Sequence, residues 1–209
     1  REQVAEILND NRMGIRQSKY SLPNQQEFVE VAGHSDMFDF IYDPRNHIHI
    51  GSCLQLHQIF YRYSPYPEAG GHYKQTNNLI TRSNTETCDY QRTPGEMIKV
   101  IQEAQTIIND RSLSTADYLK ACAHVHHRFT TIHPYPDGNG RISRAFLNWM
   151  LRYRNFPMVY IKEERKINYY EALEAIDASQ DYDPLYIVFA YELLRSYSDF
   201  QQYASGSAV

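Results

Sequence analysis

The sequence lacks the features that mark several classes of protein. It has no uninterrupted apolar run of the roughly 18 residues that a membrane-spanning helix needs, so no membrane protein is expected. It also lacks a basic excess, because 21 Lys and Arg stand against 25 Asp and Glu, and the net charge of −4 argues against general nucleic-acid binding. The chain begins with Arg1, without an initiator Met or an apolar signal segment, so we expect that the natural N-terminus is missing.

Cysteine is scarce as well. Cys53, Cys88 and Cys122 are odd in number, widely spaced and without a Cys-x-x-Cys pair, which predicts neither a disulfide framework nor a zinc knuckle. A reducing cytoplasm is therefore the expected location. What the chain has is 42% hydrophobic residues in 209, enough for the core of one main domain. Its 18 tyrosines fit either amphipathic helix surfaces or a Tyr-rich binding surface.

Apolar residues recur every three to four positions, which predicts a mostly helical protein. The clearest start is at Thr93, expected as N-cap, with Pro94 at the first helical position and Glu96 closing a capping box. Further helices are predicted near residues 35–42, 52–63, 114–132, 141–154, 169–176 and 183–194. The segment 73–81 is rich in β-formers and turn residues, and predicts a short β-hairpin.

Residues 133–144 concentrate the chemistry and read His-Pro-Tyr-Pro-Asp-Gly-Asn-Gly-Arg-Ile-Ser-Arg. The two glycines lead into the start of a helix, where unpaired N–H groups and the positive dipole end favour a phosphate. Arg141 and Arg144 share one helix face and suit further phosphates. Asp137 is placed to hold Mg²⁺, and His133 to act as a general base. Each residue alone has an ordinary structural interpretation; their combination at one loop-to-helix junction indicates a catalytic site.

This segment resembles the signature of the Fic (filamentation induced by cAMP) family, His-Pro-Phe-x-Asp/Glu-Gly-Asn-Gly-Arg-x-x-Arg. It matches at every position except Tyr135, where Phe is usual. The likeness spans roughly residues 50–197. It includes Leu-Gln-Leu-His at 54–57, Gly-His-Tyr-Lys at 71–74 with Lys74 where Arg is common, Thr-Pro at 93–94 and Asn-Tyr-Tyr-Glu-Ala-Leu at 168–173.

The resemblance implies a helical bundle with a β-hairpin flap that transfers AMP from ATP to a hydroxyl of a target protein. On that reading His133 is the base and Asp137 holds Mg²⁺ on ATP. The residues implied in nucleotide binding are Gly138, Asn139, Gly140, Arg141 for the β-phosphate, Arg144 for the γ-phosphate, and Tyr169 and Tyr170 for adenine. The residues implied in docking a target strand are Tyr73, Lys74, Gln75, Thr76, Leu79 and Ile80.

The implied organisation is an N-terminal helical extension over residues 1–49, a catalytic domain over 50–200 and a frayed tail over 201–209. Many Fic proteins carry an inhibitory helix with Ser/Thr-x-x-x-Glu-Gly/Asn, and this sequence has no such motif. The inhibitory helix is expected upstream of Arg1, in a partner, or not at all.

Other functions remain open at this point. The same motif serves transfer of another nucleotide or phospho group, or removal of AMP, although Gly140 argues against the phosphate transfer of the relative Doc. A catalytically silent protein-binding module is a further alternative. A third class is a metal-dependent hydrolase, suggested by His124, His126 and His127, although the sequence has no His-Glu-x-x-His pattern.

Overall fold

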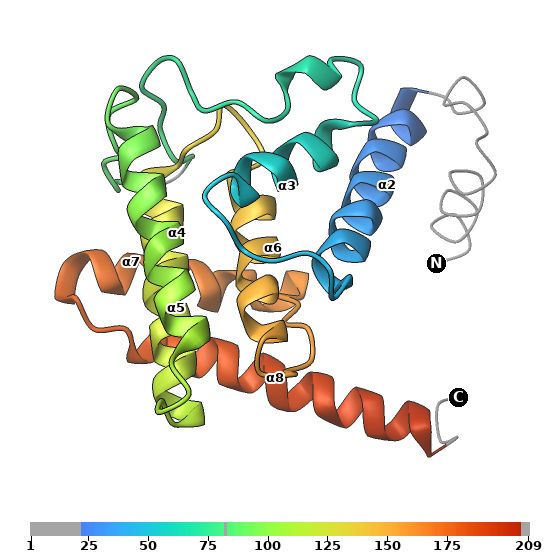
Figure 1. Cartoon of the computed structure of the whole chain (residues 1–209), viewed down its shortest axis with the longest axis vertical. Helices are drawn as coiled ribbons and strands as arrows, with labels where there is room; N and C mark the ends of the chain where they lie inside the picture. Colours follow the sequence, from blue (N-terminus) through green and yellow to red (C-terminus); the bar gives the residue numbers. More distant parts are fainter. Residues whose placement is uncertain (1–21, 82, 206–209) are drawn as a thin grey trace. The chain divides into compact units, whose positions relative to one another are not determined.

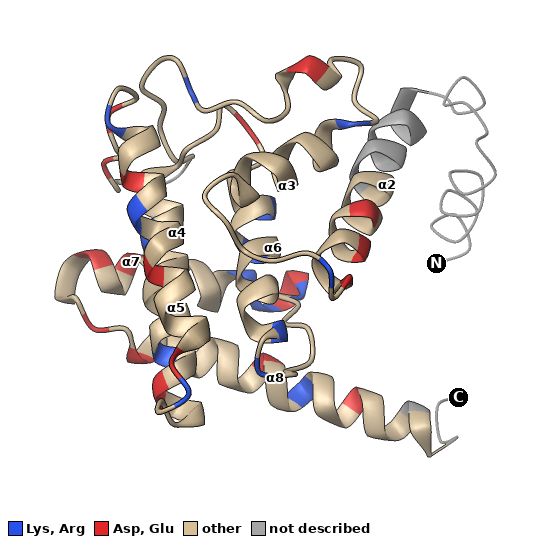
Figure 2. Ribbon diagram, viewed as in Figure 1, with Lys and Arg blue, Asp and Glu red and all other residues tan. Residues whose placement is uncertain are grey.

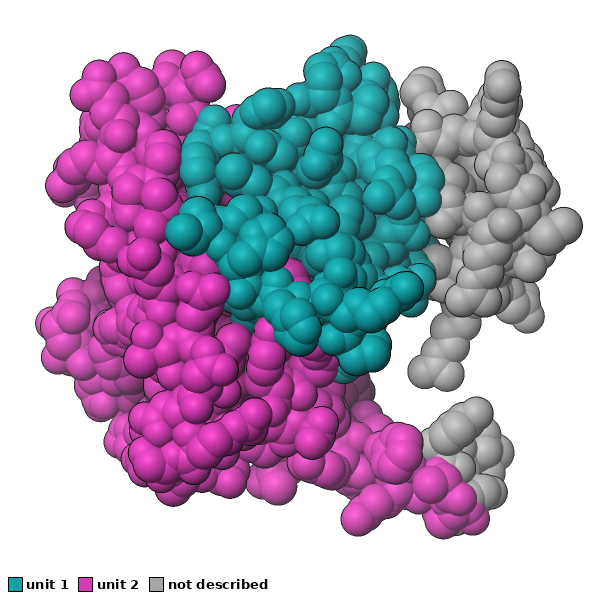
Figure 3. Space-filling model, viewed as in Figure 1, with its two compact units in different colours: residues 1–73 teal, residues 74–209 magenta. Residues whose placement is uncertain are grey.

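The computed structural model describes residues 22–81 and 83–205, and Figure 1 shows that helices dominate them. The chain divides into two compact units, residues 1–73 and residues 74–209 (Figure 3). Neither unit has a strand among the described residues. The predicted mainly α fold is thereby confirmed. The sequence-based boundaries at 49/50 and 200/201 remain predictions.

The first unit holds α2 (Leu22–Tyr42), α3 (Ser52–Tyr61) and the 3₁₀ turn η2 (Pro67–Ala69). α2 packs against α3. A Cβ atom at Gly33 would lie only 2.4 Å from the carbonyl oxygen of Phe60, so this glycine permits the close approach of the two helices. Both predicted helices are present, and α2 begins well before residue 35.

The second unit is assembled around α5 (Thr115–Ile132), which packs against α4 (Thr93–Asn109), α6 (Asn139–Arg152) and α8 (Asp183–Ala204). α7 (Lys166–Ser179), preceded by the turn η3 (Glu163–Arg165), packs against α8. The side chains that recur every three to four positions along α4 and α5 are buried: Met97, Val100, Ile101, Ala104, Ile107, Ile108, Tyr118, Cys122, Val125 and Phe129. Residues 201–204, expected in the tail, continue α8, and residues 206–209 lie outside the described part.

The helix starts follow local capping chemistry. Ser114 caps α5 as predicted, because its hydroxyl accepts a hydrogen bond from the Asp117 N–H at 3.1 Å. The predicted capping box at Thr93 is wrong: Arg92 is the N-cap of α4 and Thr93 is already helical. The Thr93 hydroxyl instead donates to the Asp89 carbonyl at 3.0 Å, and Glu96 pairs with Lys99.

The predicted β-hairpin is not formed as a strand pair in the described residues of segment 73–81. In this segment, side chains form hydrogen bonds with backbone groups that would pair with each other in a β-ladder. The Thr87 hydroxyl donates to the Asn78 carbonyl at 2.6 Å, and the Asn77 side chain accepts from the Tyr90 N–H at 2.8 Å. Asn and Thr side chains compete with strand pairing in this way, and the segment is an irregular loop.

Acidic and basic residues are interspersed along the helices of the described chain (Figure 2), in keeping with the small net charge. None of the helices in residues 22–81 and 83–205 is long and apolar enough to cross a membrane.

Candidate active site

The loop between α5 and α6 carries the predicted chemistry. α5 ends at Ile132, and His133 follows in the left-handed region with φ 50° and ψ 60°. The helix stops here because the residue before Pro134 disfavours right-handed helical angles. At the other end of the loop Gly138 has φ 82° and forms the N-cap of α6, a conformation that glycine adopts without steric cost. The C-terminus of α5 and the N-terminus of α6 thus flank one short loop.

The side chain of Asn139 braces this loop. Its Oδ1 atom accepts from the Tyr135 N–H at 2.8 Å, and its Nδ2 atom donates to the Tyr135 carbonyl at 2.7 Å. The resemblance implies nucleotide binding by Asn139; in the structure its side-chain amide holds the loop backbone. The ring of Tyr135 is fully buried near Phe129, so Tyr at the usual Phe position keeps its aromatic ring in the core.

His133 is half-buried, and its Nδ1 atom lies 3.4 Å from the Thr130 carbonyl oxygen. A carbonyl only accepts hydrogen bonds, so Nδ1 carries the proton and Nε2 keeps the basic lone pair. Burial lowers the pKa of His133, and repulsion by the Lys74 ammonium lowers it further. Both effects favour the neutral imidazole at neutral pH, which is the form a general base requires.

Lys74 and Asn78 also hold the loop. The Asn78 amide donates to the carbonyls of His133 at 3.3 Å and Tyr135 at 2.9 Å. The Lys74 ammonium donates to the Asn78 Oδ1 atom at 2.8 Å and to the Ile132 carbonyl at 3.1 Å. A cation at the C-terminus of α5 also complements the helix dipole. Lys74 is only 4% exposed, so its side chain supports the loop and does not lie on an exposed docking surface.

The other predicted docking residues lie in different environments. Gln75, Thr76 and Leu79 are exposed, with Leu79 85% exposed, and Ile80 is half-buried. Tyr73 belongs to the first compact unit. An exposed apolar side chain next to the anchored Asn78 leaves this loop available for contact with another chain.

Asp137 and Arg141 stand together at the start of α6. Their side chains form an ion pair at 2.9 Å, and the Asp137 side chain is 69% exposed. Mg²⁺ bound to a polyphosphate takes one or two protein carboxylates and completes its shell with phosphate oxygens and water. The described residues contain no cluster of three or more His, Cys, Asp and Glu side chains that would form a protein cage for a metal. One exposed carboxylate at this position fits a magnesium–nucleotide complex.

Arg144 lies one turn further along α6 and folds back toward Gly140. A Cβ atom at Gly140 would come within 3.1 Å of the Arg144 Nη1 atom. Burial raises the pKa of the Tyr169 hydroxyl, and the nearby positive charge of Arg144 opposes that rise. The two tyrosines implied in adenine binding differ in exposure: Tyr169 is 2% exposed and Tyr170 is 51% exposed.

The histidines of α5 do not converge on a metal. His124 pairs with Glu103 at 2.6 Å, His126 bonds to Tyr169 at 2.7 Å, and His127 pairs with Asp177 at 2.8 Å. Each imidazole therefore serves a separate contact between helices. This geometry gives no support to the metal-dependent hydrolase alternative.

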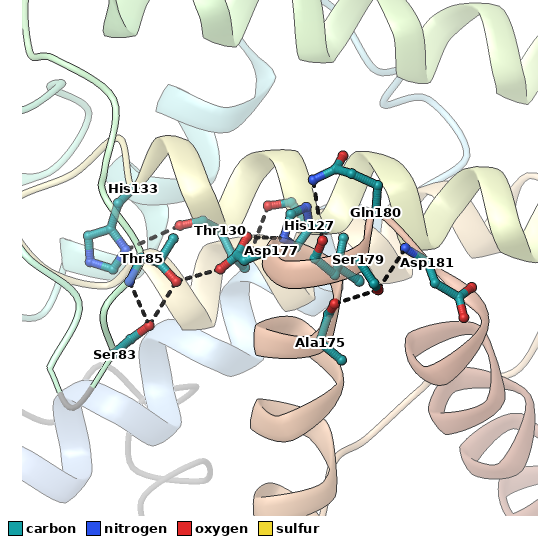
Figure 4. Close-up of polar contacts among 11 residues, drawn as sticks. Ser83, Thr85, His127, Thr130, His133, Ala175, Asp177, Ser179, Gln180 and Asp181 are labelled. Atoms are coloured by element: carbon teal, nitrogen blue, oxygen red, sulfur yellow. Dashed lines mark hydrogen bonds and ion pairs between the residues drawn. The ribbon is translucent and has the colours of Figure 1, made fainter.

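Asp177 on α7 connects two segments that sequence reasoning left unconnected (Figure 4). Its carboxylate accepts from the Thr85 hydroxyl at 2.5 Å and pairs with His127 on α5. Thr85 in turn bonds to Ser83 at 2.8 Å. The loop before α4 is thereby fixed to α5 and α7. A lone Asp late in a helix carries no sequence signal for such a contact.

Comparison with known proteins finds a family match over the segment that carries these residues. The sequence profile described as Fic/DOC family matches residues 48–151. The "Protein adenylyltransferase Fic" of Drosophila erecta is 32% identical over 81 residues, which is 39% of this chain and 16% of that protein. The chain thus matches only a small part of that relative's length.

Solved structures share the fold. A Fic domain-containing signalling protein from Bacteroides thetaiotaomicron superposes with a TM-score of 0.70 at 22% identity, covering 91% of this chain and 76% of that one. The BepC protein of Bartonella tribocorum, solved with bound AMPPNP, superposes with a TM-score of 0.63 at 15% identity, covering 81% of this chain and 86% of that one. At these identities the likeness establishes the fold.

Proposed function

Because the chain belongs to the Fic/DOC family, we propose that it transfers AMP from ATP to a Ser, Thr or Tyr hydroxyl of a target protein and releases pyrophosphate. The observation that carries the proposal is the α5–α6 loop. It places a histidine with a free-base preference at one helix end, and a glycine-led helix N-terminus with two arginines at the other.

His133 supplies the proton transfer. Its Nε2 atom accepts the proton of the target hydroxyl while the hydroxyl oxygen forms a bond to the α-phosphorus of ATP. The bond from the α-phosphorus to the bridging oxygen of the β-phosphate breaks, and pyrophosphate leaves with that electron pair. The proton on His133 then passes to solvent, which restores the base for the next turnover.

The start of α6 binds the phosphates. The N–H groups at residues 138–140 lie at the N-terminus of α6 and stabilise negative charge on the transferring phosphate. Arg141 holds the β-phosphate and Arg144 the γ-phosphate, each through the fork of its guanidinium. Asp137 would hold the Mg²⁺ that accompanies ATP, and this ion would neutralise phosphate charge.

The target segment is proposed to lie along the exposed part of the loop, at Gln75, Thr76 and Leu79, and to pair with its backbone by strand addition. Such pairing would bring a hydroxyl to His133, because Asn78 fixes this loop to the His133 and Tyr135 carbonyls. An inhibitory helix supplied by a partner, or by residues outside the given sequence, belongs to the same proposal.

Incubation with ATP labelled in the α-phosphate, with Mg²⁺ and a cell lysate, tests the function. We expect label on protein, a mass gain of one AMP on the modified chain, and no more label from γ-labelled ATP than the lysate gives without this protein. In the His133→Ala variant the label transferred per unit time should fall by roughly 10² to 10⁴. Label transferred from γ-labelled ATP alone would indicate phosphate transfer, and absence of both labels with the parent protein would favour a silent binding module.

A further inference from the structure

Residues 75–87, described except for residue 82 and called the docking loop below, are fixed to the rest of the second unit at two points. At the first point, the Asn78 amide donates to the Tyr135 carbonyl of the α5–α6 loop at 2.9 Å. At the second, the Thr85 hydroxyl donates to the Asp177 carboxylate on α7 at 2.5 Å. The proposed function uses the first contact and gives the second no role.

Asp177 is itself held by a residue of a third element. Its Oδ2 atom accepts from Thr85, and its Oδ1 atom lies 2.8 Å from the Nε2 atom of His127 on α5 (Figure 4). The His127 side chain is 8% exposed, and the ring of Tyr182 packs against it at a right angle with a centroid distance of 5.6 Å. Both carboxylate oxygens of Asp177 are thus bound to protein partners, one in the docking loop and one on a buried helix face.

The direction of each hydrogen bond follows from the chemistry of the groups. A carboxylate ion only accepts, so the Thr85 hydroxyl gives its single proton to Asp177, and Nε2 of His127 carries a proton. The Thr85 oxygen therefore accepts from the Ser83 hydroxyl at 2.8 Å, and the Ser83 oxygen accepts from the Thr85 N–H at 3.2 Å. One continuous chain of hydrogen bonds connects the docking loop to α7 and α5.

The second contact restricts the part of the docking loop that is most exposed. Between Asn78 and Thr85 lies Leu79, whose side chain is 85% exposed. A loop that is fixed at both ends samples fewer conformations than a loop fixed at one end, and this freedom has to be lost when the loop pairs with another chain. The contact at Thr85 therefore lowers the entropic cost of docking, and it contributes no group to the proposed phosphate contacts.

We propose that Asp177 is a positioning residue that holds the docking loop, through Thr85, in the conformation to which the target protein binds. This inference rests on the proposed function, in which a target segment pairs with the docking loop. It adds a residue of α7 that lies outside the continuous motif of residues 133–144. Because Asp177 acts on the target through Thr85, its loss should raise KM for the target protein and leave kcat and ATP affinity close to those of the parent.

Hydrogen exchange followed by mass spectrometry tests the contact in the nucleotide-free protein. The amides of the docking loop should exchange faster in Thr85→Val and in Asp177→Ala than in the parent, because the loop is released at one end. The matched control is Thr106→Val, which removes a hydroxyl that bonds within α4 to the Gln102 carbonyl at 3.0 Å. It should leave exchange of the docking loop unchanged. Exchange at the parent rate in Thr85→Val would overturn the proposal.

Steady-state kinetics tests the positioning role. The acceptor is the protein that the parent labels most strongly in the lysate, purified after identification by mass. Thr85→Val should raise its KM on the order of tenfold, as expected for loss of one hydrogen bond to a charged group, and should change kcat and the calorimetric ATP affinity by less than about twofold. General damage to the fold would lower kcat and ATP affinity as well. A loss of ATP affinity as large as the rise in KM would overturn the proposal and indicate a nucleotide contact.

A double-mutant cycle decides whether Asp177 acts through Thr85. In the Thr85→Val background, Asp177→Ala should raise KM for the target no further, because the group that Asp177 holds is gone. Additive increases in KM would overturn the proposal. If Asp177→Ala fails to fold, Asp177→Asn replaces it, since one amide oxygen cannot accept from both Thr85 and His127.

The outcomes also separate this proposal from the proposed function. If the parent and Thr85→Val both label the target with equal KM, the positioning role is refuted and AMP transfer stands. If the parent protein labels no target at all, the proposed function and the positioning role are both refuted.

Discussion

Replacing Lys74 by Met removes a buried positive charge next to the proposed base while keeping a side chain of similar length. The Lys74 ammonium donates to the Ile132 carbonyl at 3.1 Å and to Asn78 Oδ1 at 2.8 Å, and it repels a proton on His133. The substitution therefore has two separate expected effects. One is on the stability of the fold, and the other is on the pH at which His133 becomes protonated.

The stability effect follows from the bonds that are lost. The single proton of the Thr87 hydroxyl is shared between the Asn78 carbonyl at 2.6 Å and Asn78 Oδ1 at 3.2 Å, so Oδ1 keeps a weak donor, whereas the Ile132 carbonyl loses the ammonium. One unreplaced bond to a charged donor is worth about 1–3 kcal/mol. For a chain of this size each kcal/mol lowers Tm by roughly 2–4 °C, so a decrease of roughly 2–12 °C is expected. Lys99→Met is the control, because it removes only a surface ion pair with Glu96 and should cost less than about 1 kcal/mol.

The pH effect has a definite sign. Transfer needs neutral His133, so the rate falls as the pH drops through its pKa. In the parent protein burial and, second, the Lys74 charge hold this pKa below the ordinary value of about 6.5. Lys74→Met removes the second cause, and the acid limb of the kcat/KM profile should move to higher pH. An acid limb at the parent's pH, in a variant that is folded at the assay temperature, would refute the electrostatic part of this reasoning.

Two other substitutions test separate parts of the account. Asp137→Ala should abolish Mg²⁺-dependent transfer and leave Tm unchanged, because the side chain is 69% exposed and pairs with Arg141 at the surface; activity in Mg²⁺ titrations like that of the parent would exclude the metal role. Glu192→Ala should lower the free energy of unfolding by about 3–5 kcal/mol, because this fully buried carboxylate lies between Arg165 at 3.1 Å and Arg195 at 2.8 Å; a loss below 1 kcal/mol in denaturant titration would contradict this.

The sequence predicted the helices because their apolar periodicity and end signals are local. Ser114 caps α5, and the residue before Pro134 ends it. The predicted N-cap of α4 was one residue too late. The hydroxyl of Thr93 donates to the Asp89 carbonyl and so does not cap a helix N–H group. The β-hairpin prediction failed for a similar reason. The Thr87 hydroxyl donates to the Asn78 carbonyl, and the Asn78 side chain donates to the Tyr135 carbonyl of the α5–α6 loop, so these groups form side-chain hydrogen bonds and no strand ladder.

The candidate site also combines local and distant residues, and only the local ones were predictable. The motif residues follow one another in the chain, so a continuous pattern was enough to predict roles for His133, Asp137 and the arginines. The residues that support them come from distant positions: Asn78 precedes His133 by 55 residues, and Tyr169 follows His126 by 43. Neither pairing has a periodicity or a spacing that a single sequence displays. Only the folding of the chain brings Tyr169 on α7 to His126 on α5.

The most direct test of the central claim is the comparison of His133→Ala with the parent protein in two assays on the same preparation. One assay follows AMP transfer from α-labelled ATP, and the other measures ATP affinity by calorimetry. Because His133 is assigned proton transfer alone, transfer should fall by roughly 10² to 10⁴, the usual worth of general acid–base catalysis. ATP affinity should stay within about twofold of the parent, a difference of under 0.5 kcal/mol. Parallel loss of affinity and transfer, or transfer at the parent rate, would contradict the account.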